Sequence, residues 1–240
     1  MEERNYDFKA GELLLLDKPL EWTSFDVVNS IRVNIKRQLG IKKLKVGHAG
    51  TLDPLATGML IICTGKMTKQ IDLIQAEEKE YTGTFKIGAT TPSFDLESEE
   101  DNSFPTDHIT EELLFESIKP FIGKIEQTPP IFSAIKIDGK RAYEYARENK
   151  DVVIKSKQVE IKEFELTRIE LPEVDFRVVC SKGTYIRSLA RDFGETLKSG
   201  AYLTALRRTR IGSHKIEQAI SIEKMREIIE HVGENYQAEE

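Results

Sequence analysis

The residues whose types and spacing could do chemistry in this chain are gathered in one short stretch. Residues 46–58 read Val-Gly-His-Ala-Gly-Thr-Leu-Asp-Pro-Leu-Ala-Thr-Gly, with three glycines, one proline and two threonines. Such a composition predicts an irregular, tightly turned loop. Asp53 precedes Pro54, which fixes its own φ and biases Asp53 away from helical angles. A loop of this kind can hold one carboxylate rigidly in a cleft, where a carboxylate can act as a nucleophile.

A second interpretation of the loop needs no catalysis. The side chain of an aspartate in a turn often bonds only to nearby backbone amides, and for an isolated Asp-Pro pair this Asx-type turn is the more common outcome. The loop alone therefore leaves both interpretations open for Asp53.

The elements on either side of the loop have clearer patterns. Residues 11–19 predict a short strand that a proline turn ends. Thr23 or Ser24 is a suitable N-cap for a helix whose apolar residues recur at helical spacing up to Gly40. Residues 59–64 predict a buried strand. The loop with Asp53 is thus expected between a helix and a strand of the same core.

The remainder of the chain mixes helices and strands without a regular βαβ repeat. This order favours an α+β fold, with a mixed, mostly antiparallel sheet and flanking helices. The expected strands cover residues 81–87, 158–170 and 174–180, the expected helices cover residues 110–121, 184–199 and 221–231, and residues 201–210 are characterised only as a basic segment.

Length and composition exclude several classes of protein. The 240 residues correspond to one or two domains. No apolar run approaches the roughly 20 residues of a membrane span, and the N-terminus lacks an apolar signal core, so we expect a cytoplasmic protein without membrane association. Cys63 and Cys180 each lie in an apolar stretch without a metal-ligand pattern. We therefore expect no metal.

The distribution of charge matters more than its sum. A formal net charge of −6 argues against a nucleic-acid ligand when the chain is taken as a whole. Residues 27–52 and 196–216, however, contain several lysines and arginines and no acidic residue. Because phosphates respond to the local field, these two runs are candidate RNA-binding surfaces. Each run by itself is more often an ordinary solvated face.

The loop sequence Gly47–Leu60 closely resembles the catalytic motif of the TruB family of tRNA pseudouridine synthases. Further strings resemble other motifs of that family, in the family's order. They are Leu14–Pro19 with its Lys-Pro pair, Lys79–Tyr81, Pro129–Lys136, Gly139–Arg147, Cys180–Leu189 and Leu206–Arg208. The resemblance extends from about residue 11 to about residue 212.

The resemblance implies catalytic roles for three residues. Asp53 corresponds to the family's essential aspartate, which engages the target nucleotide. Tyr81 corresponds to an active-site tyrosine that contacts the target base. Arg187 corresponds to an arginine that pairs with the aspartate, and such a guanidinium would keep the carboxylate ionised.

The resemblance also implies residues that contact RNA. His48 corresponds to a histidine that holds the flipped-out RNA loop, and Leu206 to an apolar residue of the uracil pocket. The other RNA-binding residues expected from the matched motifs are Lys18, Tyr185, Arg207 and Arg208.

The implied activity is the isomerisation of uridine 55 in the T loop of tRNA, with a base that is flipped out of its stack. The resemblance implies that this reaction needs no metal and no organic cofactor. The implied fold has a central RNA-binding cleft and an RNA-gripping insertion at about residues 120–155. We expect residues 1–216 to form the catalytic domain. Residues 217–240 would add a C-terminal helix and an acidic tail, too short for the PUA domain of many family members. The expected partner is the T arm of tRNA, with no DNA and no obligate protein partner.

A tRNA chaperone and a glycoside-type hydrolase are the two alternatives to a pseudouridine synthase. A non-catalytic tRNA chaperone would share the basic surfaces, but it would not require Asp53, Tyr81 and Arg187 together. A glycoside-type hydrolase requires two carboxylates. No second carboxylate stands out beside Asp53 in its motif.

Overall fold

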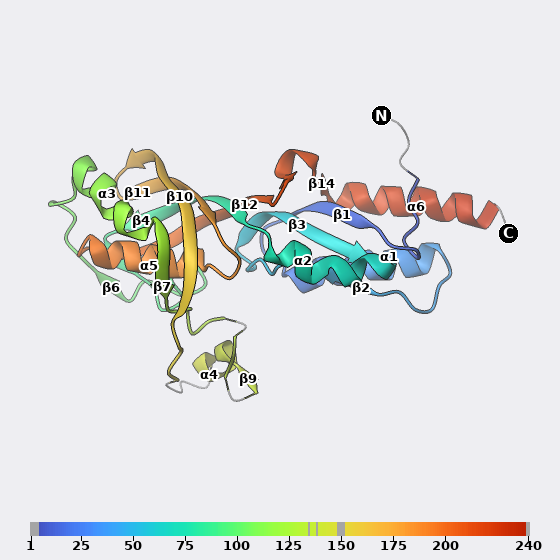
Figure 1. Ribbon diagram of the computed structural model, residues 1–240, viewed down its shortest axis with the longest axis horizontal. Coiled ribbons are helices and arrows are strands. Elements are labelled where there is room, and N and C mark those ends of the chain that lie inside the picture. The colour runs from blue at the N-terminus through green and yellow to red at the C-terminus, as the bar shows by residue number, and fades with distance from the viewer. Residues whose placement is uncertain (1–4, 134, 138, 148–151, 239–240) are drawn as a thin grey trace. The chain divides into compact units, whose positions relative to one another are not determined.

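The chain forms two compact units. The computed structural model describes residues 5–133, 135–137, 139–147 and 152–238. The described residues up to Lys79 and from Arg207 onward form one unit, here called the terminal unit, and residues 80–206 form the other, the central unit. The sequence patterns gave no sign of this division, because the terminal unit is assembled from the two ends of the chain. Figure 1 shows the elements of both units, with a colour that runs from blue at the N-terminus to red at the C-terminus.

The terminal unit contains strands on both sides of the candidate loop, and helices that cover them. Its elements are β1 (Leu13–Lys18), α1 (Ser24–Gln38), β2 (Val46–His48), β3 (Ala56–Thr64), the 3₁₀ helix Gly65–Gln70, α2 (Ile71–Ala76), β13 (His214–Lys215), the 3₁₀ helix Ile216–Gln218, β14 (Ile220–Ser221) and α6 (Ile222–Ala238).

The central unit contains most of the longer strands. Its elements are β4 (Lys79–Ile87), β5 (Ala89–Thr90), β6 (Asn102–Ser103), α3 (Glu111–Ile118), the 3₁₀ helix Lys119–Phe121, β7 (Gly123–Gln127), β8 (Lys136–Ile137), β9 (Lys140–Arg141), α4 (Ala142–Arg147), β10 (Lys157–Glu170), β11 (Glu173–Cys180), α5 (Ile186–Thr196) and the first part of β12 (Ala201–Ile211).

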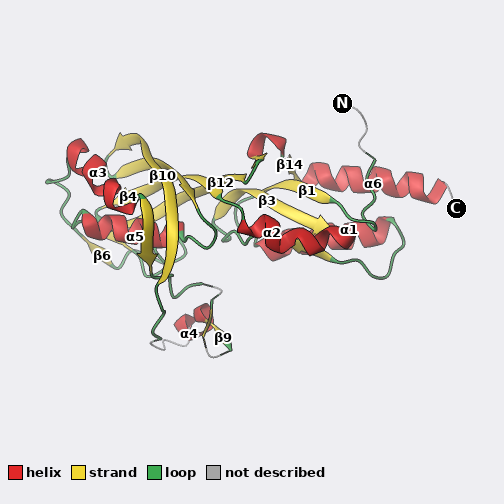
Figure 2. Cartoon of the chain, viewed as in Figure 1, coloured by secondary structure: helices red, strands yellow, loops and turns green. Residues whose placement is uncertain are grey.

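The hydrogen-bonded strand order of the main sheet is β14-β1-β3-β12-β4-β11-β10-β7, with β2 paired to β3 and β13 paired to β12. The β1–β14 pair is parallel, whereas β1–β3, β2–β3, β12–β13, β10–β11 and β7–β10 are antiparallel. Helices and strands alternate irregularly along the chain (Figure 2). The predicted α+β class with a mixed, mostly antiparallel sheet is confirmed.

Two apolar layers sandwich the strands of the terminal unit. In β1 and β3, Leu16 is paired with Leu60 and Leu14 with Ile62, and these four side chains pack with α1 and α6. The alternate residues of the two strands face a second cluster, on the side of α2. Because successive strand residues point to opposite faces, strands that are buried on both faces read as continuous apolar runs. This core fixes both ends of the candidate loop.

The helix before the loop begins where the sequence predicts. Thr23 is the N-cap of α1, and its hydroxyl accepts a hydrogen bond from the Asp26 backbone N–H. The Asp26 carboxylate in turn accepts from the backbone N–H of Thr23, which completes a capping box. The helix ends at Gln38, and Gly40 follows with a φ of 62°, a conformation that glycine adopts without strain.

Aromatic side chains make up the core of the central unit. The rings of Phe85 on β4 and Phe176 on β11 stack at 4.0 Å between centroids, and Phe164 and Phe193 complete the cluster edge-on or tilted. This arrangement anchors β4, β10, β11 and α5 to one another, so that residues at the ends of these elements have fixed positions.

Three sequence expectations differ from the structure. The irregular loop predicted over residues 46–58 is shorter, because residues 46–48 belong to β2 and residues 56–58 to β3. Residues 201–210, characterised only as a basic segment, lie within strand β12 of the main sheet. The expected acidic tail is largely helical, because α6 continues to Ala238. Among the helices that the structure describes, none combines the length and the apolar character that a membrane crossing requires.

Candidate active site

The candidate loop connects β2 to β3 in the terminal unit, and backbone bonds close both of its ends. The Ala49 N–H donates to the Ile61 carbonyl at 2.9 Å, and the Ala56 N–H donates to the Asp53 carbonyl at 3.1 Å. Gly58 has a φ of 102°, and a Cβ at that position would lie 2.3 Å from the backbone oxygen of Arg208. Only glycine allows β3 to approach β12 this closely.

The buried side chain of Arg208 holds the backbone of the loop by hydrogen bonds. Its side chain is 1% exposed, although its guanidinium is charged. The guanidinium donates to the carbonyl oxygens of Met59 at 2.8 Å, Gly50 at 3.0 Å and Thr51 at 3.4 Å. A buried charge is tolerated only when its hydrogen-bonding groups have partners, and here those partners are the loop's own carbonyls. Arg208 therefore fixes the path of the backbone that leads to Asp53.

Lys18 holds the other side of the loop. Its side chain is fully buried at the end of β1. The ammonium group donates to the carbonyl oxygens of Trp22 at 2.6 Å, Pro19 at 2.8 Å and Pro54 at 3.2 Å. Burial lowers the pKa of Lys18 to about 8, while the Asp53 carboxylate acts in the opposite direction. The predicted Lys-Pro turn is thus tied to the residue that follows Asp53.

Ser24 adds a third attachment, from the first residue of α1. The Leu52 N–H donates to the Ser24 hydroxyl at 2.8 Å, and this hydroxyl donates to the Leu52 carbonyl at 3.1 Å. The Glu21 N–H also donates to the Pro54 carbonyl at 2.9 Å. The backbone on both sides of Asp53 is therefore fixed by hydrogen bonds, while the Asp53 side chain itself is half-buried. This is the geometry that a rigidly presented carboxylate requires.

The low pKa of Lys18 gives a stability prediction. Between pH 8 and about 10.5, the unfolded chain retains a Lys18 proton that the folded chain has lost. The desolvation cost of Lys18 is therefore fully present below pH 8 and is relieved as pH rises through this window. We expect the unfolding free energy of the wild type, minus that of a Lys18→Met variant, to increase by up to about 3 kcal/mol between pH 8 and 10.5.

Urea denaturation of both proteins across this pH range measures the difference, and the subtraction removes the titration of all other groups. Parallel stability profiles for the two proteins would show that Lys18 does not carry a depressed pKa.

His48 and Arg207 complete the predicted residues of the terminal unit. His48 lies at the end of β2, where burial, and next the charge of Arg208, lower its pKa and favour the neutral imidazole. Arg207 is partly exposed and makes a two-pronged ion pair with Asp17, at 2.6 and 3.0 Å, and also donates to the Thr57 hydroxyl at 3.4 Å.

The structure distinguishes among the predicted RNA-binding residues of this unit. Lys18 and Arg208 are buried and hold the loop, a placement that favours a positioning role over direct contact with RNA. His48 and Arg207 retain partial exposure. The sequence signal for the two buried cations was weak, because a lysine or an arginine usually faces solvent.

The other predicted residues lie in the central unit. Tyr81 is on β4 and is 8% exposed, and Leu206 is half-buried on β12. Tyr185 is the N-cap of α5, and the ammonium of Lys157 lies 4.6 Å from its ring centroid. The predicted pairing of Asp53 with Arg187 would link the two units, and it stays a prediction.

Arg187 lies in the first turn of α5 and is 4% exposed. Its guanidinium donates to the carbonyl oxygens of Phe132 at 2.9 Å and Ser93 at 3.3 Å, and lies 3.5 Å from the Asp95 carboxylate. The turn around Asp95 contains Phe94 with a φ of 64°. Within the central unit, Arg187 is therefore held as rigidly as the loop is held in the terminal unit. Among the described residues, no cluster of histidine, cysteine or acidic side chains could hold a metal ion.

Comparison with known proteins gives a consistent assignment. Residues 36–186 match the N-terminal domain model of the TruB family of pseudouridylate synthases, and residues 187–240 match the C-terminal domain model of tRNA pseudouridylate synthase B. The tRNA pseudouridine synthase B of Phocaeicola vulgatus is 61% identical over 92% of this chain and 94% of its own length. That of Flavobacterium johnsoniae is 59% identical over 90% of this chain and 95% of its own length.

Solved structures agree with the assignment of the fold. A chain in the crystal structure of a Cbf5–Nop10–Gar1 complex matches with a TM-score of 0.67 and 30% identity over 92% of this chain. A chain of an H/ACA RNP bound to a substrate RNA containing 2′-deoxyuridine matches with a TM-score of 0.65 and 27% identity. The present chain spans about half the length of each of these two, at 54% and 53%. The chain belongs to the TruB family of tRNA pseudouridine synthases, the isomerases that make pseudouridine 55 in tRNA.

Proposed function

We propose that this chain isomerises uridine 55 within the T loop of tRNA, with Asp53 as the carboxylate that engages the flipped-out nucleotide. The observation that supports this role most directly is the support of the loop. Two buried cations, Lys18 and Arg208, and the Ser24 hydroxyl fix the backbone around one half-buried carboxylate. An aspartate that only closed a turn would need no such support.

The reaction suits a carboxylate without a metal or redox partner. The bond between ribose C1′ and uracil N1 breaks, the uracil turns, and a bond forms between C1′ and C5. The C5 proton leaves to solvent and N1 gains a proton, so that atoms and electrons balance. A carboxylate nucleophile can form a covalent intermediate during such a rearrangement.

Four further residues are proposed to act on the nucleotide. Tyr81 would contact the target base and Leu206 would line the uracil pocket, where an aromatic face and an apolar side chain suit a flipped-out base. Arg187 would pair with the Asp53 carboxylate. Half-buried His48, with its lowered pKa, would hold the flipped RNA loop as a neutral imidazole.

We also propose that recognition centres on the T arm. Single-stranded loops are where RNA can present splayed bases, and basic side chains beside such a site would contact the phosphates of the stem. The RNA-gripping insertion was expected at about residues 120–155, and within that range residues 123–127 form strand β7, which pairs with β10. Residues 128–156, which link β7 to β10, are the segment proposed to grip the RNA.

An isolated T-arm stem-loop tests this proposal. We expect its kcat/KM to lie within about tenfold of that of a complete tRNA transcript, a difference of about 1.4 kcal/mol. A stem-loop with cytidine at position 55 should give no pseudouridine. If only the complete tRNA is modified, recognition depends on other parts of the tRNA. If free uracil is released, the reaction is hydrolysis.

A further inference from the structure

The segment that links β7 to β10 leaves and rejoins the sheet at one place, here called the foot, which consists of Gln127, Thr128, Ser156 and Lys157. Gln127, the last residue of β7, is the strand partner of Lys157, the first residue of β10. The hydroxyls of Thr128 and Ser156 lie 2.8 Å apart. The two ends of the segment are therefore held together at the foot, and residues 129–155 lie between these ends.

The foot is attached to the N-terminus of α5 by the side chain of Gln127, which is fully buried. The Tyr185 N–H donates to Gln127 Oε1 at 2.8 Å, and Gln127 Nε2 donates to the Tyr185 carbonyl at 3.0 Å. A primary amide supplies one acceptor and two donors, so one side chain satisfies both backbone groups of Tyr185.

The Gln127 side chain supplies one of the two hydrogen bonds of a capping box, the bond to the backbone N–H of the N-cap residue. Tyr185 is the N-cap residue of α5, and its side chain makes no capping hydrogen bond. In a capping box, the third residue of the helix bonds to the N–H of the N-cap residue. That third residue here is Ser188, but its hydroxyl donates to the Thr128 carbonyl at 2.8 Å, and Gln127 takes over the bond to the N-cap.

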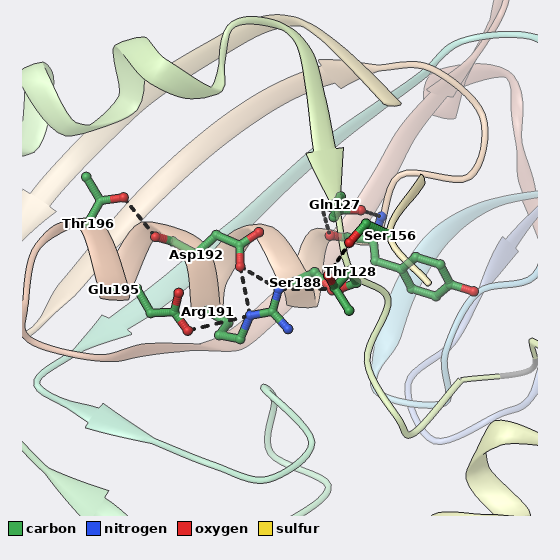
Figure 3. A network of polar contacts seen from close by, with 9 residues as sticks. Gln127, Thr128, Ser156, Ser188, Arg191, Asp192, Glu195 and Thr196 are labelled. Carbon is green, nitrogen blue, oxygen red and sulfur yellow. Dashed lines mark hydrogen bonds and ion pairs between the residues drawn. The ribbon is translucent and has the colours of Figure 1, made fainter. Parts of the chain in front are cut away.

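Figure 3 shows this network from Gln127 and Thr128 to Ser188 and Arg191. The guanidinium of Arg191 also donates to the Thr128 carbonyl, at 3.4 Å. The carbonyl of Thr128 is therefore bonded to two residues of the same helix, one turn apart. The foot and the first two turns of α5 form one hydrogen-bonded body.

Arg187 lies inside this body. In the chain, Arg187 lies between Tyr185 and Ser188. Tyr185 is hydrogen-bonded to the Gln127 side chain, and the Ser188 hydroxyl donates to the Thr128 carbonyl. Its own guanidinium donates to the Phe132 carbonyl of the segment at 2.9 Å. A rotation or shift of the α5 N-terminus would move the guanidinium away from Asp95 and Phe132.

We propose that Gln127 is a positioning residue that fixes Arg187 for catalysis by tying the α5 N-terminus to the foot of the 128–156 segment. The inference rests on the role proposed for Arg187.

The test measures steady-state kcat and KM with a tRNA transcript as substrate. A Gln127→Met variant retains the length of the side chain and loses both bonds to Tyr185. We expect kcat to fall about 10- to 100-fold, the effect of a displacement of about 1 Å at a reacting group, with a smaller change in KM.

A Ser188→Ala variant removes only the bond to Thr128 and is expected to lower kcat by a smaller factor. This variant tests the proposal if the Gln127→Met protein does not fold. Gln158→Met, the same substitution at an exposed position of β10, is the matched control and should leave kcat unchanged.

A double-variant cycle with Arg187→Lys separates positioning from general damage. If Gln127 acts through Arg187, the Gln127→Met substitution should lower kcat much less in the Arg187→Lys background than in the wild type. The proposal would be overturned if Gln127→Met lowered kcat by the same factor in both backgrounds. It would also be overturned if Gln127→Met raised KM and lowered the thermal stability while kcat stayed at the wild-type value. Wild-type kcat in Arg187→Lys alone would instead refute the role proposed for Arg187, so the two failures are distinguishable.

Discussion

An Asp53→Asn variant is expected to lose at least about 10⁴-fold in kcat while it binds tRNA with a Kd within about threefold of wild type. Asparagine has almost the same shape as aspartate and can make the same turn contacts. The backbone bonds of Ala49 and Ala56 that close the loop do not involve the side chain. What the substitution removes is the negative charge and the nucleophilic oxygen. Steady-state turnover assays with excess tRNA, together with filter binding, measure the two quantities.

The matched control is Asp72→Asn, which neutralises an exposed aspartate on α2 of the same unit and should leave kcat and Kd unchanged. Substantial activity in Asp53→Asn would favour the interpretation in which Asp53 only bonds nearby amides. Parallel loss of binding and activity would instead point to a collapse of the loop.

An Arg208→Met variant is expected to lose both stability and activity. Methionine leaves the carbonyls of Gly50, Thr51 and Met59 without the donors that Arg208 provides. A buried acceptor that loses its partner costs about 1–3 kcal/mol, so we expect a loss of about 3 kcal/mol in the free energy of unfolding, or about 6–12 °C in Tm. The freed loop should lower kcat about 100-fold, because Asp53 is no longer held in one position.

Arg37→Met is the control for this variant, since it removes an exposed arginine of α1 in the same unit and should change stability by less than about 0.5 kcal/mol. Thermal unfolding and steady-state turnover assays test the expectation. An Arg208→Met protein with wild-type Tm and wild-type kcat would mean that the loop keeps its conformation without the guanidinium.

Local patterns predicted the local elements well. The start of α1 followed from a capping residue and helical spacing, both of which are encoded within a few residues. The irregular loop around Asp53 followed from its glycines and Pro54. In each case the determining interactions lie within the segment itself, so the sequence contains the information that forms them.

The sequence analysis did not predict strand β12, because the charged residues of this segment suggested a solvent-exposed surface. A run with Arg207, Arg208 and Arg210 resembles a solvated surface, yet Arg208 points into the protein and bonds to the candidate loop. Arg210 is paired with Glu78 at 2.7 Å. The partners that allow these charges to lie within a sheet are about 130 to 160 residues away in the chain, as the bonds to Glu78 and Gly50 show. No local pattern can reveal them.

The same argument applies to the candidate site. The family resemblance predicts catalytic roles for Asp53 and Arg187 and RNA contacts for Lys18 and Arg208, and these roles stay predictions. The burial of Lys18 and Arg208 depends on carbonyl groups that the folded chain brings to them, such as Pro54 for Lys18. Gln127 was missed altogether, because a glutamine at the end of a strand carries no signal until the helix that it caps is in place.

Mapping pseudouridine at every uridine of an unmodified tRNA transcript, after incubation with wild-type and Asp53→Asn protein, tests the central claim most directly. The account predicts pseudouridine at position 55 alone with the wild type, and none with the variant, although both proteins bind the transcript. A wild-type protein that binds the transcript tightly and leaves every uridine unchanged would contradict the account and favour a tRNA chaperone.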